Sequence, residues 1–101
     1  MSDRTGPVWL IDASITSLSG SSEQLLAQAP QLFRRWMMIQ NTGNANIGVN
    51  LTGGTAAIGG TGTLTLVPNG SMIFSNEFCP AQKVMIIGTA GQPVACLVDP
   101  A

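Results

Sequence analysis

The stretch "RRWMMIQN", residues 34–41, decides the fold that we predict for this chain. Successive side chains of a β-strand point to opposite faces, which would put Trp36 and Met38 together on one face. Met37 and Ile39 would lie on the other face. Because both faces are apolar, we expect this strand to be central in a β-sandwich or buried under a neighbouring element.

Short runs that suit β-strands flank this stretch on both sides, with turns rich in glycine, proline and asparagine between them. Turn signals at this spacing are typical of a sandwich or barrel. Segment 21–29 fits either a short helix, capped by Ser21 and Gln24, or an extended strand. We therefore predict an all-β fold, a small antiparallel β-sandwich or jelly-roll-like barrel of about seven to eight short strands. Its other predicted strands are 8–15, 46–51, 63–67, 71–75, 83–88 and 94–98.

The chain has 101 residues, which is the size of one domain. We assign residues 1–7 to an N-terminal arm that ends at Gly6-Pro7, and residues 8–101 to a single β-sandwich domain. In an oligomer such an arm could lie along a neighbouring subunit and add backbone contacts.

Two tight turns are predicted beside the strands. Asn41 and Gly43 begin the first turn, and we expect Asn41 to cap it rather than to bind a ligand. Pro68, Asn69 and Gly70 form the second turn, in which proline presets φ and glycine supplies conformational freedom.

The glycine-rich run "LTGGTAAIGGTGTLTL", residues 51–66, is close to a phosphate-binding loop in spacing. Such a loop needs the pattern G-x-x-x-x-G-K-[ST] and must open a helix, but Gly60 stands at the lysine position. Alternating threonine and leucine then predict a strand rather than a helix. We expect a loop between two strands that binds no phosphate.

Charge is sparse, with four basic and five acidic residues, which make up 9% of the chain against a typical ~25%. So few basic groups argue against a nucleic-acid partner and against a polybasic membrane anchor. No apolar run approaches the roughly eighteen residues that a membrane helix needs. A surface poor in charge predicts a subunit, in a homo-oligomer, that is largely covered by other chains. The alternative is a small neutral β-protein.

Groups suited to catalysis are scarce. The chain has no histidine and no tyrosine, and its five carboxylates are scattered singly. We predict no enzymatic activity, no cofactor and no metal site. Cys79 and Cys96 lack the spacing and the histidines of a zinc site, and we expect buried thiols, with a disulfide as the alternative.

Arg34 and Arg35 begin the central strand and would point to opposite faces. One of them could pair with Glu77 or Asp99, or bind backbone carbonyls of a partner. The alternative is a solvated strand end. The proposed interface or core-strand residues are Arg34, Arg35, Trp36 and Met38.

The runs "RRWMMIQNTGNANIGVNLTGG", "GTLTLVPNGSMIF" and "VMIIGTAGQPVACLV", which span about residues 34–98, resemble small virion proteins of tailed bacteriophages, of the capsid decoration and cement type. The shared features are an arginine, a hydrophobic strand ending in I-x-N, a turn with glycine, a glycine-rich loop, an aromatic-bearing strand and two closing strands. The matching positions are Arg34 or Arg35, Ile39, Asn41, Gly43, Val49, Gly53, Leu66, Gly70, Phe74 and Ile86.

The resemblance implies a non-enzymatic structural protein, made in the host cytoplasm and located in the virion at the capsid surface. Its partner would be the major capsid protein or another virion protein, whose shell it would bind and stabilise. Another virion component, such as a head-fibre base, connector or tail subunit, is the alternative. A carbohydrate-binding module with Trp9 and Trp36 as a stacking platform is a third possibility, although convergent polar groups are missing from the sequence.

Overall fold

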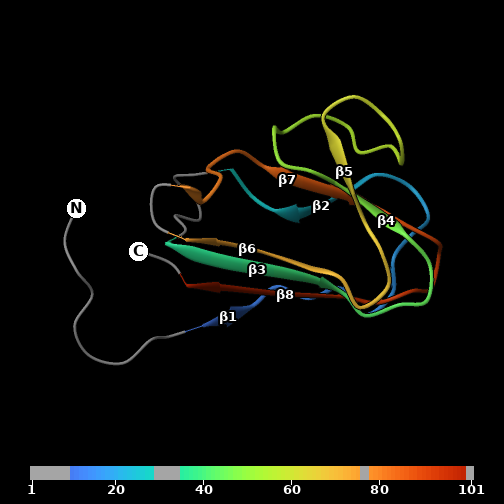
Figure 1. Cartoon of the computed structure of the whole chain (residues 1–101), viewed down its shortest axis with the longest axis horizontal. Coiled ribbons are helices and arrows are strands. Elements are labelled where there is room, and N and C mark those ends of the chain that lie inside the picture. Colours follow the sequence, from blue (N-terminus) through green and yellow to red (C-terminus); the bar gives the residue numbers. More distant parts are fainter. Residues whose placement is uncertain (1–9, 29–34, 76–77, 100–101) are drawn as a thin grey trace.

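The computed structural model describes residues 10–28, 35–75 and 78–99, which form eight β-strands in two four-stranded sheets and contain no α-helix (Figure 1). Sheet A has, in spatial order, β1 (Ile11–Asp12), β8 (Val94–Asp99), β3 (Trp36–Asn41) and β6 (Ser71–Ser75). Sheet B has β2 (Glu23–Leu26), β7 (Val84–Ile87), β4 (Ile47–Asn50) and β5 (Thr63–Leu66). All neighbouring strands are antiparallel, so the predicted all-β sandwich is confirmed.

Each predicted strand overlaps an observed one, and segment 21–29 supplies the eighth. Of its two alternatives the extended one is right, because Glu23–Leu26 pairs with β7 and buries Leu25 and Leu26. Pairing along a whole strand outweighs the small stability of a helix of two turns. The arm at 1–7, Trp9 and Arg34 lie outside the described residues.

The strand order shows how the chain wraps. The pairs β1·β8, β2·β7, β3·β6 and β4·β5 make one long antiparallel ribbon, which folds so that β3 also meets β8 and β4 also meets β7. This arrangement is a jelly roll. The β3·β8 pair of sheet A and the β4·β7 pair of sheet B have the same register, because in both the numbers of two paired residues add to 135. This agreement arises because the two connections between the sheets are equally long, seven positions from Asn41 to Gly48 and seven from Ile87 to Val94.

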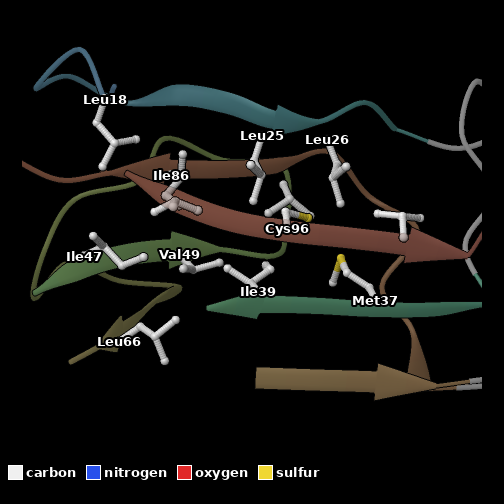
Figure 2. Close-up of a cluster of buried hydrophobic side chains, with 13 residues drawn as sticks. Leu18, Leu25, Leu26, Met37, Ile39, Ile47, Val49, Leu66, Ile86 and Cys96 are labelled. Carbon is white, nitrogen blue, oxygen red and sulfur yellow. The ribbon is translucent and has the colours of Figure 1, made fainter. Parts of the chain in front are cut away.

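The core lies between the sheets and is filled by every second residue of the central strands (Figure 2). Met37 and Ile39 of β3 have no exposed surface, nor do Val49 of β4 and Ile86 of β7. Packing is tight at the end of the sandwich as well. A Cβ added at Gly88 would lie 2.7 Å from Cδ1 of Leu18, so a larger residue here would force the buried Leu18 side chain to shift.

Asn41 is a fully buried polar residue at the end of β3. Its side-chain amide donates hydrogen bonds to the carbonyl of Ala45, at 2.8 Å, and to the carbonyl of Leu66, at 2.9 Å. Its side-chain oxygen accepts a bond from the amide of Gly43, at 3.0 Å. One carboxamide therefore joins the turn after β3 to the end of β5 in the other sheet.

The turn after β5 is held by the backbone of the same asparagine. The amide of Gly70 donates to the carbonyl of Val67, at 2.8 Å, which closes a turn with Pro68 at its second position. Asn69 has φ of 66° and donates its amide to the Asn41 carbonyl. The left-handed residue that this turn needs is thus Asn69, rather than the glycine after it.

We predict that Asn41→Ala lowers the free energy of unfolding by about 2–4 kcal/mol, because it leaves two carbonyls and one amide without their partner in a buried place. Asn44→Ala is the matched control, since the side chain of Asn44 is exposed, and it should change stability by less than about 0.5 kcal/mol. Urea unfolding measures both. Equal effects of the two substitutions would contradict the role of Asn41.

Candidate binding surface

The outer face of sheet A carries an apolar row across three strands. Met37 and Ile39 point inward, so the alternating residue Met38 points away from the core. The strand register places Met38 between Ile73 of β6 and Leu97 of β8. Ile73 is 57% exposed, and Met38 and Leu97 are partly exposed. We call Ile73, Met38 and Leu97 the apolar row.

Polar residues surround the apolar row. Asp12 of β1 pairs with Leu97 at one end of the row and is exposed. Ser71 and Ser75, also exposed, flank Ile73 on β6. An apolar centre with a polar rim is the usual composition of a protein interface.

A shallow hollow of about 70 Å³ lies beside the row, lined by Met38, Gln40, Ala95 and Leu97. Pockets for small molecules usually measure about 300–1,000 Å³. This hollow is therefore too small for a ligand of that size.

The structure separates the two alternatives that the sequence left open for the central strand. Trp36 and Met38 are half-buried on the outer face, whereas Met37 and Ile39 form the core side. Trp36 and Met38 therefore lie on the central strand without lining the core between the sheets, and their assignment as interface or core-strand residues stays a prediction. Arg35, just before β3, donates its backbone amide to the carbonyl of Asp99, at 2.8 Å.

The outer face of sheet B differs because the glycine-rich segment 51–62 folds over it. Asn50 donates to the carbonyl of Thr55, at 3.3 Å, and accepts a bond from the amide of Thr52, at 2.8 Å. Ala56 is buried and donates its amide to the hydroxyl of Ser22, at 2.9 Å. The segment connects β4 with β5, as the sequence predicted, and these contacts give it a role as a cover.

The side chain and the backbone amide of Ser14 form hydrogen bonds with the carboxyl of Asp12 and lower its pKa. The hydrogen bond from the amide measures 3.0 Å.

Within residues 10–28, 35–75 and 78–99 no three histidine, cysteine or carboxylate side chains gather as metal ligands. The same residues contain no helix long and apolar enough to cross a bilayer.

The two cysteines differ in exposure. Cys96 is completely buried in the core, as expected, while Cys79 is only partly buried. Both are thiols in this structure, so the alternative of a Cys79–Cys96 disulfide is not realised.

No protein-family model matches this chain, and no curated protein matches it. Among solved structures it is similar to a chain of the Bacillus endospore appendages, which form a family of disulfide-linked pili. The TM-score is 0.51 and the identity 16%, over 97% of this chain and 92% of the other. The likeness extends over almost the whole of both chains, and at this identity it concerns the fold alone.

We predict that Met37→Ala costs about 2–5 kcal/mol of stability, because Met37 is fully buried. Trp36→Ala should cost clearly less, although the deleted side chain is larger, since Trp36 is only half-buried on the outer face. Urea unfolding of the two variants compares them directly. A greater loss for Trp36→Ala would show that the indole ring belongs to the core.

Proposed function

We propose that this chain is a non-enzymatic structural protein of a virion, a decoration or cement protein that binds the shell of the major capsid protein and stabilises it. The observation that carries the proposal is the apolar row, Ile73, Met38 and Leu97, exposed with a polar rim on sheet A. The resemblance of about residues 34–98 to small virion proteins of tailed bacteriophages points the same way.

The row would act by burying apolar surface against the shell. Each square ångström of apolar surface removed from water contributes about 25 cal/mol, and the polar rim supplies hydrogen bonds that fix the orientation. Few charges must lose their hydration, because only 9% of the residues are charged. Many copies bound side by side would together hold the shell, with no chemical step required.

Other positions in the virion use the same kind of contact. A head-fibre base, a connector or a tail subunit would also bind through an apolar patch, but in far fewer copies than a shell protein. The number of copies for each copy of the major capsid protein, measured on purified particles, separates these positions.

A second candidate function is a subunit of a pilus, and the observation that favours it is the likeness of fold to the disulfide-linked endospore pili. In this chain Cys96 is fully buried, so Cys79 is the cysteine with surface available for a bond between subunits. One such cysteine per chain can join copies only in pairs, so a fibre of this chain would consist of disulfide-linked pairs held to one another by non-covalent contacts, and a reducing agent would split the pairs.

We predict that the purified protein co-sediments with capsid shells that lack it, and that Met38→Lys weakens this binding by a factor of ten or more. A lysine in the middle of the apolar row would have to be buried without a partner. Ile58→Lys is the matched control, because Ile58 is similarly apolar and 53% exposed but lies in the segment that covers sheet B. It should bind as the wild type does, with or without dithiothreitol.

Three results would contradict this proposal. The first, a protein that does not bind shells, would refute the virion function, and the second, equal weakening by the two lysine substitutions, would refute the role of the apolar row. The third is assembly into fibres that dissolve in dithiothreitol, which would favour the pilus. Binding to a glycan array that is lost in Trp36→Ala would instead favour a carbohydrate-binding module.

A further inference from the structure

Four strands lie at sheet edges: β1 and β2 are protected against pairing with another chain, whereas β6 and the shorter, four-residue β5 are uncharged and regular. β1 is two residues long and carries Asp12, and β2 carries Glu23 and a shift of register between Gln24 and Leu26. Short length, charge and irregular register are the usual means by which an edge strand avoids a partner. β6, with the sequence Ser-Met-Ile-Phe-Ser, has five residues in regular register, no charge and no proline.

The open side of β6 presents a regular set of backbone groups. Among the described residues β6 pairs with β3 alone. The bond from the amide of Asn41 to the carbonyl of Gly70, at 2.9 Å, shows which groups point toward β3. Because these directions alternate along an antiparallel strand, the N–H and C=O groups of Ser71, Ile73 and Ser75 point away from β3.

The side chains of β6 are symmetric about Ile73. Exposed serines stand at both ends, partly buried apolar residues stand at Met72 and Phe74, and exposed Ile73 is at the centre. A strand with this symmetry matches its own reverse, which is what a contact around a two-fold axis requires.

We propose that β6 pairs with β6 of a second copy of this chain, antiparallel and around a two-fold axis at Ile73. Ser71 of each copy then stands opposite Ser75 of the other, and Ile73 stands opposite Ile73. The three pairs use the backbone groups that point away from β3 and form about six hydrogen bonds. The two copies of sheet A become one continuous sheet.

The pairing also covers apolar surface that one copy leaves incompletely covered. Met72 and Phe74 lie beside Ile39 and Met37 on the inner face of sheet A, yet they are only partly buried while those two neighbours are fully buried. In the dimer Met72 of one copy lies opposite Phe74 of the other, where the sulfur can contact the ring. On the outer face the two apolar rows join at Ile73.

The test is sedimentation velocity of the full chain over a range of concentrations. The wild type should sediment as a dimer of twice 10.5 kDa. Ile73→Lys should weaken dimerisation by at least 100-fold, because it brings two ammonium groups together at the axis on adjacent strands. Its fold should be kept, since Ile73 is 57% exposed. Ile11→Lys, at the opposite edge of sheet A and 42% exposed, is the matched control and should dimerise as the wild type does.

A second measurement detects the dimer directly and so does not depend on a loss of dimerisation in a variant. In a Cys79→Ser background, Ile73→Cys should be cross-linked between copies by a short bismaleimide, and Ile11→Cys should not. A monomeric wild type, a dimer that survives Ile73→Lys, or cross-linking at Ile11 instead of Ile73 would each overturn the pairing. The pairing of β6 does not rest on the virion function. If the pairing fails, the Met38→Lys experiment still decides whether the chain binds shells. If the chain dimerises but does not bind shells, the virion function alone is refuted.

Discussion

The buried carboxamide of Asn41 is the contact on which the rest of the structure depends. It binds the carbonyls of Ala45 and Leu66, and so it connects the corner after β3 in one sheet with the end of β5 in the other. Its backbone holds the turn that leads into β6. A buried polar group of this kind is costly unless every partner is present, which makes this corner specific to one arrangement of the two sheets. The register of β6 against β3, and with it the position of Ile73 beside Met38, follows from this corner.

The outer faces of the two sheets differ. Sheet B is covered by the chain's own glycine-rich segment, which is tied down at Asn50 and Ala56. Sheet A keeps an apolar row with a polar rim and an unprotected edge at β6. In this account the face of sheet A binds the shell and the edge of sheet A binds a second copy. Both contacts rely on apolar surface and backbone hydrogen bonds, which agrees with a chain so poor in charge.

The strands of this fold could be predicted from the sequence because their alternation and their turns are local signals. Segment 21–29 could not be decided, since Ser21 and Gln24 suit a helix cap as well as a loop, and only the pairing with β7 selects the strand. The inner face of β3 could not be chosen either, because Trp36 and Met38 are as apolar as the residues that turned out to be buried. β6 is an edge strand because of the order of the strands in the sheet, and no single stretch of the sequence shows that order.

Among the positions that carry the phage resemblance, Ile39, Asn41, Val49 and Ile86 are fully buried, and Gly53 has a positive φ. These positions therefore bear mainly on the fold, and a function inferred from them needs a test of the surface itself.

The most direct test of the central claim, that the outer face of sheet A holds this chain in a virion, is electron cryomicroscopy of purified particles that contain it. The account predicts density for this jelly roll on the shell, with Met38 and Leu97 covered by the capsid protein and the segment 51–62 facing away from it. Density in which sheet A faces solvent and sheet B faces the shell would contradict the account.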